Sequence, residues 1–153
     1  MDTGVPATGR QAYDCRIKPQ LDLATSRKAF VNSTIDSTAT LRDVLDQWKA
    51  GVDAHEAQRI ASLFTEDAIF QGLHPYSVGR EGVAAYYASQ PPGLTATYRI
   101  VETRQLAADL VLGYLSVDFM FTDRPGLNVN LCVVIRQVEN VWRICHYQVS
   151  LLP

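Results

Sequence analysis

Apolar side chains follow helical spacing in the segment that begins near residue 37. The inward positions of this segment are Leu41, Val44, Leu45, Trp48 and Val52. Together they form one apolar stripe on a helix of roughly four turns. Thr40 and Asp43 provide a capping-type start for it. The pattern therefore predicts an amphipathic helix that buries a tryptophan.

Two shorter helices and a strand are expected next. Asp53 and Glu56 open a second helix, which residues 65–67 end. Its inner face carries Ala57, Ile60, Ala61 and Phe64. Residues 68–71 are typical of a short strand. Residues 79–82 then lead into a third helix, which carries Val83, Tyr86 and Tyr87, and the Pro-Pro-Gly run at 91–93 forces a turn.

After residue 93 the pattern changes to long β-rich runs with short separators. The runs cover about residues 95–106, 111–122, 127–138 and 141–151. Short separators between long strands indicate an antiparallel meander. Helices followed by strands predict an α+β fold with three N-terminal helices packed in a strongly curved, mainly antiparallel sheet. A cone of this kind leaves a cavity between the sheet and the helices.

The first 36 residues differ from the rest of the chain. They contain Gly4, Pro6, Gly9 and Pro19 and show no sustained periodicity. We interpret residues 1–36 as an irregular N-terminal extension and residues 37–153 as one α+β cone domain.

Composition and charge narrow the classes of partner. The formal net charge of −2 gives no electrostatic case for nucleic acid or an anionic membrane. No apolar run approaches the ~20 residues of a membrane span. The N-terminus lacks the apolar core of a secretory signal, and the odd cysteine count argues against a disulfide framework, so we expect a cytoplasmic protein.

Neither a metal nor a nucleotide cofactor is expected. The three histidines, His55, His74 and His146, show no ligand spacing with one another or with a cysteine. The chain also has no glycine-rich loop of the kind that cradles phosphates.

Four separated segments resemble one family in their order along the chain. They are Leu41–Val52, Leu63–Ala68, Gly79–Val83 and Val141–Tyr147. Over about residues 38–152 the sequence resembles the SnoaL/ketosteroid-isomerase-like branch of the nuclear-transport-factor-two-like superfamily. The resemblance implies the cone fold. That superfamily includes isomerases, polyketide cyclases, dehydratases, epoxide hydrolases and non-catalytic binding or assembly domains, so fold alone does not give the function.

The catalytic sets of two branches do not transfer to this sequence. Limonene-epoxide-hydrolase-like members use an Asp-Arg-Asp set, and ketosteroid-isomerase-like members use an Asp base with a Tyr and a protonated Asp. Neither set can be placed here residue by residue, so neither activity carries over.

The last hairpin decides which side chains of the final strand face the cavity. A two-residue loop, Glu139-Asn140, would turn His146 inward opposite Val133. A three-residue loop, with Asn140 left-handed and a bulge after it, would turn Tyr147 inward with Cys145 and Val149. We favour the three-residue loop, because Asn140 stands where similar family members have a glycine.

The favoured register predicts an apolar outer sheet face. This face would carry Cys132, Val134, Trp142 and Ile144, which are too apolar to leave in water. We therefore expect a back-to-back homodimer through it. Asp118 and His146 would then be rim or interface residues rather than catalysts.

Polar candidates for the pocket are few. Gln71 and His74, at the end of the stretch FTEDAIFQGLHP, are expected to form its lip, and Tyr147 points into it. His74 and Tyr147 are the candidate catalytic residues, either one moving a proton while the other polarises an oxygen. The candidate ligand-binding residues are Trp48, Phe64, Phe70, Gln71, Tyr87, Tyr98, Val117, Phe119 and Val133.

Three functions remain open from the sequence. One is a SnoaL- or isomerase-type enzyme (an isomerase, cyclase or hydrolase) acting on an apolar polyketide- or steroid-like compound. It lacks an inward carboxylate unless Glu102 faces the cavity. The second is a non-catalytic dimeric protein that binds an apolar or aromatic small molecule. The third is an assembly domain, which a cavity filled by Trp48, Tyr87 and Phe119 would support.

Overall fold

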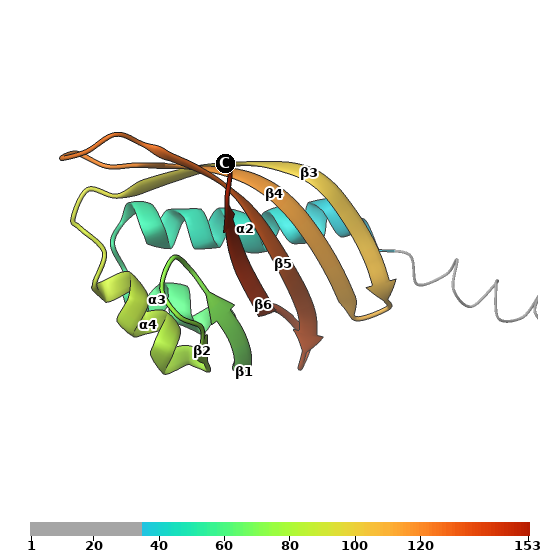
Figure 1. Cartoon of the computed structure of the whole chain (residues 1–153). Coiled ribbons are helices and arrows are strands. Elements are labelled where there is room, and N and C mark those ends of the chain that lie inside the picture. The colour runs from blue at the N-terminus through green and yellow to red at the C-terminus, as the bar shows by residue number, and fades with distance from the viewer. Residues whose placement is uncertain (1–34) are drawn as a thin grey trace, which may run out of the picture. The chain divides into compact units, whose positions relative to one another are not determined.

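The computed structural model describes residues 35–153, and these residues form three helices and six strands (Figure 1). The helices are α2 (Ser37–Asp53), α3 (Ala57–Ser62) and α4 (Arg80–Ala88). The strands are β1 (Phe64–Gln71), β2 (Ser77–Val78), β3 (Thr95–Ala107), β4 (Leu110–Met120), β5 (Leu127–Val138) and β6 (Val141–Leu151). The predicted extension, residues 1–36, lies outside the described residues except for its last two positions.

The first helix confirms the predicted apolar stripe but not its predicted cap. Asp36 caps α2, because its side chain accepts a hydrogen bond of 3.0 Å from the backbone N–H of Ala39. The helix therefore begins before Thr40, which we had expected to cap it. The buried residues of α2 are Leu41, Val44, Leu45, Trp48, Gly51 and Val52.

The second helix ends earlier than predicted. Helix α3 stops at Ser62, and Phe64 already begins strand β1 rather than closing the helix. The backbone N–H of Ile144 donates to the carbonyl of Leu63 at 2.8 Å, so the backbone already pairs with β6 at this point. Phe64 is nevertheless fully buried, as expected of an inward residue.

The sheet has the strand order β2-β1-β6-β5-β4-β3. The run from β3 to β6 is the predicted antiparallel meander, and β1 pairs with β6 in parallel. In Figure 1 these strands curve across α2, whereas α3 and α4 lie beside β1 and β2. The α+β fold with three helices and a mainly antiparallel curved sheet is thus confirmed. None of the described helices is both long and apolar enough to cross a membrane.

The β5–β6 hairpin has a two-residue loop, so the predicted three-residue loop is wrong. Val138 pairs with Val141, and Glu139 and Asn140 between them have φ angles of 50° and 63°. Positive φ at both central positions is the signature of a type I′ turn, whose twist matches that of the strands it joins. Glutamate rarely adopts this conformation, so the residue types did not favour this loop over the three-residue alternative.

A bulge at Cys145 then changes which side chains of β6 face inward. Ile144 lies opposite Ile135, whereas His146 lies opposite Val134, so Cys145 is one residue extra. Tyr147, beyond the bulge, points inward as predicted, and His146 points outward.

The bulge also corrects the predicted dimer surface. Before the bulge, Trp142 lies opposite Gln137, on the inner face. Ile144 is fully buried, and Trp142 is half-buried against the core. The two residues therefore do not belong to the outer face, and the expectation that they do was wrong.

Two carboxylates point away from the core. Asp118 is exposed and accepts a hydrogen bond of 2.6 Å from Asn128, which confirms its expected place on the outer face. Glu102 is also exposed, and it forms an ion pair of 2.6 Å with Arg104. Neither residue supplies an inward carboxylate.

Helix α2 lies close to the sheet at Gly113. A Cβ atom at this position would overlap the side chain of Leu41. The absence of a side chain at Gly113 therefore lets α2 lie directly on β4. This close approach leaves little free volume in the cone.

Candidate functional site

The interior of the cone contains a chain of hydrogen bonds between buried side chains. The indole N–H of Trp48 donates to the hydroxyl of Tyr87 at 2.9 Å. The hydroxyl of Tyr87 in turn donates to that of Tyr147 at 3.3 Å. Because an indole N–H can only donate, the proton of Tyr87 is free for Tyr147. The chain thus ends at the Tyr147 hydroxyl, which makes no other hydrogen bond within residues 35–153.

Aromatic contacts hold this chain of hydrogen bonds in place. The ring of Tyr147 stacks on Phe70 with 4.8 Å between centroids and 22° between planes. Phe64 packs against Tyr147 at 6.0 Å, and Phe119 meets Trp48 edge-on at 6.2 Å. Stacked and edge-on pairs add directional packing energy to burial. The Tyr147 hydroxyl is therefore held in one position.

Burial keeps both inner tyrosines protonated. It raises the pKa of Tyr147 well above its ordinary value, and the neighbouring Tyr87 raises it further. Burial likewise raises the pKa of Tyr87, although the hydrogen bond that it accepts from Trp48 acts in the opposite direction. At neutral pH both groups are hydrogen-bond donors, and neither is a base.

The cavity beside Tyr147 is small. Its volume is about 20 Å³, which suffices for a single water molecule. The residues that line it are Leu73, Tyr86, Tyr87, Gln90, Leu94, Phe119, Phe121, Leu127, Tyr147 and Val149. The roomy cavity expected from the sequence is therefore largely filled by side chains.

Leu73 is the exposed residue in the lining of this cavity, so Leu73 and the half-buried Tyr86 bonded to it mark its mouth. The backbone N–H of Leu73 donates to the Tyr86 hydroxyl at 3.3 Å, and the Tyr86 ring packs edge-on against Tyr87. Gly72 is the reason for this closeness, because a Cβ there would overlap the Tyr86 ring. The glycine after Gln71 thus lets Tyr86 lie across the opening.

The two candidate catalytic residues do not share a cavity. His74 is exposed, and its ring contacts Tyr86 at 5.4 Å between centroids. His74 lines a separate open hollow with Phe70 and Tyr86, whereas Tyr147 lines the inner cavity. Tyr86 lines both, so it stands between the two candidates. Gln71 is exposed and lines neither.

The remaining candidate ligand-binding residues divide into three groups. Tyr87 and Phe119 line the inner cavity. Five are buried core residues without a place in its lining, namely Trp48, Phe64, Phe70, Val117 and Val133. Tyr98 is half-buried elsewhere, where its hydroxyl donates to Asp46 on α2.

Several lining residues were not among the sequence candidates. Phe121 and Leu127 flank the β4–β5 turn, and Phe119 pairs directly with Leu127. If the alternation of β4 is continued through the β4–β5 turn, it places both residues on the inner face with Phe119. Leu94 follows the Pro-Pro-Gly turn, and no periodicity in the sequence marks it as a lining residue.

Within residues 35–153 no three His, Cys, Asp or Glu side chains gather as metal ligands. The cysteines of this part, Cys132 and Cys145, are half-buried free thiols. The residues that converge in the interior are therefore aromatic, with hydroxyl and indole donors among them.

Solved structures of similar fold cover most of the chain. A ketosteroid isomerase-like protein from Erwinia carotovora atroseptica is 16% identical, with a TM-score of 0.68 over 78% of this chain and 99% of that one. An NTF-2-like protein of unknown function from Shewanella oneidensis is 13% identical, with a TM-score of 0.65 over 74% and 98%. A candidate scytalone dehydratase from Novosphingobium aromaticivorans is 12% identical, with a TM-score of 0.66 over 80% and 89%.

These identities are low enough that the likeness shows the fold alone. Among curated proteins, no sequence matches the chain. The family model for the SnoaL-like domain matches residues 41–153, which include most of α2, the whole sheet and the aromatic interior. The chain therefore belongs to the SnoaL-like domain family.

Proposed function

We propose that this chain is a small-molecule pocket protein whose interior binds an apolar or aromatic compound with one hydrogen-bond acceptor. The observation that carries the proposal is the chain of donors from Trp48 through Tyr87 to Tyr147. The last hydroxyl lies beside the inner cavity and has a proton to offer. A carbonyl or ether oxygen of a ligand would accept it, while the aromatic walls would bind the ligand body.

A ligand must enlarge the cavity before it can bind. Leu73 and Tyr86 at the mouth are the side chains to move, because Leu73 is 46% exposed and Tyr86 is half-buried. They are joined by one hydrogen bond of 3.3 Å. Rotation of Tyr86 away from Tyr87 would connect the inner cavity with solvent. The ligand would select this opened form.

Binding without chemistry is the function that these residues favour. The titratable side chains buried within residues 35–153 are Tyr87 and Tyr147, and their raised pKa values make them donors. Proton abstraction needs a base within hydrogen-bond reach of the substrate. A donor without a base orients a ligand and polarises its oxygen.

A second candidate function is an isomerase, cyclase or hydrolase acting on a polyketide- or steroid-like compound. The observation in its favour is the contact of His74 with Tyr86. If Tyr86 rotates outward, His74 and Tyr147 would border the same opening. His74 would then move a proton while Tyr147 polarises an oxygen. Similarity to a ketosteroid isomerase-like protein gives this candidate additional support.

Tryptophan fluorescence provides the test of binding. The chain has two tryptophans, so a Trp142→Phe background leaves Trp48 as the reporter inside the cone. We expect flat aromatic ketones of increasing ring number to quench it saturably. Tyr147→Phe removes the hydrogen bond to the ligand and should raise the dissociation constant about tenfold. Tyr76→Phe, on the exposed loop between β1 and β2, is the matched control and should bind like the parent.

Two results would speak against the proposal. One is the absence of saturable quenching by any ketone of the series, with the fold intact by circular dichroism. The other is equal affinity of the Tyr147→Phe and Tyr76→Phe proteins. Turnover of a ketone with loss of activity in His74→Ala would instead support the enzyme.

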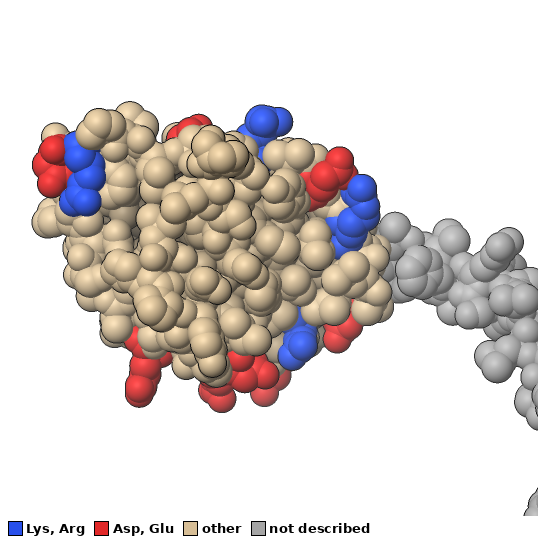
Figure 2. Space-filling model, in the orientation of Figure 1, with Lys and Arg blue, Asp and Glu red and all other residues tan. Residues whose placement is uncertain are grey.

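We also propose that two copies pair back to back through the outer face of the sheet. Two neighbouring cross-strand pairs, Leu112 with Val134 and Tyr114 with Cys132, form an apolar group there. Figure 2 shows few charged side chains over β4 to β6, and those present lie at the margins. A self-complementary dimer needs such a patch, since the same surface meets itself.

The dimer has its own test in sedimentation velocity. Val134→Lys should give a monomer, because a buried lysine would lack a partner in the interface. Val78→Lys places the same charge on an exposed position of β2 and should leave the dimer unchanged. A monomeric parent protein at micromolar concentration would exclude the dimer.

A further inference from the structure

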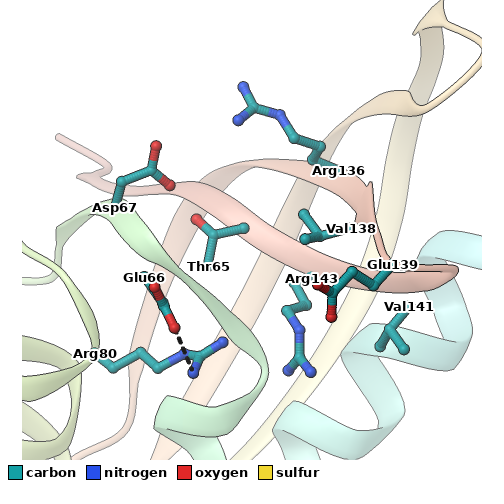
Figure 3. A pocket seen from close by; sticks show the side chains of 9 residues that line it. All are labelled: Thr65, Glu66, Asp67, Arg80, Arg136, Val138, Glu139, Val141 and Arg143. Carbon is teal, nitrogen blue, oxygen red and sulfur yellow. Dashed lines mark ion pairs between the residues drawn. The ribbon is translucent and has the colours of Figure 1, made fainter.

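A hollow of about 630 Å³ lies outside the cone, where the pairing of β1 with β6 is interrupted (Figure 3). Residues 65–68 of β1 lie in this interruption, between the pairs that Phe64 and Ile69 form with β6. Three arginines and three carboxylates line the hollow, so its formal charge is zero. In Figure 3 the guanidinium groups of Arg136 and Arg143 point to opposite sides. These charges therefore do not converge on one ligand group, whereas the polar side chains of the inner cavity border a common space.

Gln90 brings a second polar group to the inner cavity. It lies in the turn that follows α4 and lines the cavity together with Tyr147. Gln90 is half-buried, and its side-chain amide donates to the backbone carbonyl of Tyr86 at the mouth, whereas Tyr147 is only 2% exposed. The cavity thus has one polar group at its inner end and another near its mouth.

The backbone carbonyl of Tyr86 has three donors near it. The hydroxyl of Ser89 donates to it at 2.7 Å, and the backbone N–H of Ser89 donates at 3.2 Å. The amide of Gln90 is the third donor, at 3.3 Å. A carbonyl oxygen has two lone pairs, so the two bonds from Ser89 satisfy it. The bond from Gln90 is the longest of the three, and breaking it should cause the least loss of stability.

The amide of Gln90 also has unused hydrogen-bonding capacity. A side-chain amide carries two donor hydrogens and an acceptor oxygen. In the described part of the chain, the bond to Tyr86 is the only hydrogen bond that this side chain makes. The oxygen of the amide therefore remains available to a donor on a ligand, and a hydroxyl group is such a donor.

The backbone of Gln90 is held in place by the turn that follows it. Pro91 restricts the backbone conformation of the residue before it. The N–H of Leu94 donates to the carbonyl of Pro91 at 3.3 Å, which closes the turn. A Cβ at Gly93 would overlap the side chain of Thr122, so the turn packs closely on the β4–β5 hairpin. Gln90 therefore combines a fixed backbone with a weakly held amide, which suits it to recognise one ligand group.

We propose that Gln90 binds a hydroxyl group at the outer end of the ligand, so that the interior selects hydroxylated aromatic ketones. The ketone oxygen would accept from Tyr147, and the ligand hydroxyl would donate to the side-chain oxygen of Gln90. The aromatic side chains of the same lining would bind the rings. This inference rests on the proposed binding of an apolar compound in the interior, and it adds the residue that determines specificity.

A ligand in the mouth of the cavity would separate Gln90 from water. The side-chain oxygen of Gln90 would then lack a partner unless the ligand supplied a donor, and a buried polar group without a partner is unfavourable. A ketone without the hydroxyl should therefore bind less tightly than its hydroxylated analogue, although both bury the same rings.

Isothermal titration calorimetry on the full chain with matched ketones tests this inference. One pair is acetophenone and para-hydroxyacetophenone, and the other is methyl naphthyl ketone without and with a hydroxyl group on the distal ring. We expect the hydroxyl to lower the dissociation constant about tenfold in at least one pair. Gln90→Met keeps the side chain long and removes the amide, so it should abolish this gain and leave the binding of the plain ketones unchanged.

Gln47→Met is the matched control. Like Gln90, Gln47 donates to the backbone carbonyl four residues before it, but it is exposed on α2 and does not line the cavity. This variant should retain the full gain from the hydroxyl. Tyr147→Phe should weaken the binding of both members of a pair by the same factor, because its contact is with the ketone oxygen.

The outcomes separate this inference from the function on which it rests. If no ketone of either pair binds the parent protein, both are overturned. Equal binding of the two members of each pair would overturn the inference about Gln90 and leave binding in the interior intact. A gain from the hydroxyl that persists in Gln90→Met would show that another residue binds this group.

Discussion

Replacing Tyr87 with phenylalanine should destabilise the fold more than the equivalent change at Tyr147. The Tyr87 hydroxyl is the middle group of the buried chain, accepting from Trp48 and donating to Tyr147. Its removal leaves the indole N–H without an acceptor and the Tyr147 hydroxyl without its donor. Tyr147→Phe leaves a single group, the Tyr87 hydroxyl, without its partner.

The magnitude follows from counting the groups that lose a partner. A buried polar group without its hydrogen bond costs about 1–3 kcal/mol. Tyr87→Phe should thus lower the free energy of unfolding by about 2–6 kcal/mol, and Tyr147→Phe by about 1–3 kcal/mol. The double variant leaves only the Trp48 N–H unpaired. It should therefore be no less stable than Tyr87→Phe alone, a clear departure from additivity.

Urea unfolding followed by circular dichroism measures these free energies. Tyr76→Phe, at an exposed position of the loop between β1 and β2, is the control and should change the free energy of unfolding by less than about 0.5 kcal/mol. The reasoning would be refuted if the Tyr87→Phe and Tyr147→Phe effects simply add in the double variant. It would also be refuted if Tyr87→Phe were as stable as the control.

Three more predictions concern stability. Gly113→Ala would overlap Leu41 and should lower the free energy of unfolding by about 1–3 kcal/mol, measured by urea titration. Changing Glu139 to Asn and Asn140 to Gly would suit the type I′ turn. This double change should raise the free energy of unfolding by about 1 kcal/mol, and with it the melting temperature. The two buried tyrosines have raised pKa values, so the unfolded chain loses their protons first as pH rises. Stability should be level below pH ~10 and fall above it, by up to about 1.4 kcal/mol per pH unit for each tyrosine, in unfolding titrations at stepped pH.

Long periodic runs were the part of the fold that the sequence could reveal. The structure places β5 at Leu127–Val138 and β6 at Val141–Leu151, as the alternation and the short separators had indicated. In these runs each residue repeats the same preference, so local errors average out. The stripe on α2 was readable for the same reason.

Features of the fold that depend on a single residue could not be predicted from the sequence. The register of β6 depends on a glutamate at positive φ and on one extra residue at Cys145. A slip of one position reverses every side chain that follows, and the two events together restored Tyr147 to the inner face. Trp142 and Ile144, which lie between them, were consequently placed on the wrong face.

The free volume of the interior could not be predicted from the sequence either. It depends on how closely α2 approaches β4 at Gly113 and on the Tyr86 ring lying over Gly72. Such distances arise from packing between elements far apart in the sequence. Residue types alone identified an aromatic interior but not how completely these rings fill it.

The interrupted pairing of β1 with β6 divides the sheet into parts of unequal resistance to opening. The β3–β6 meander is paired along its length with only single-residue bulges, whereas β1 joins it with residues 65–68 out of register. Leu73 and Tyr86 both lie in the segment beyond this seam, on the loop after β1 and on α4. Local unfolding follows such boundaries, so amide hydrogen exchange should be faster in β1, β2 and α4 than in the meander. The mouth of the interior would then open as one cooperative unit, with the hydrogen-bonded tyrosine Tyr147 remaining on the stable side.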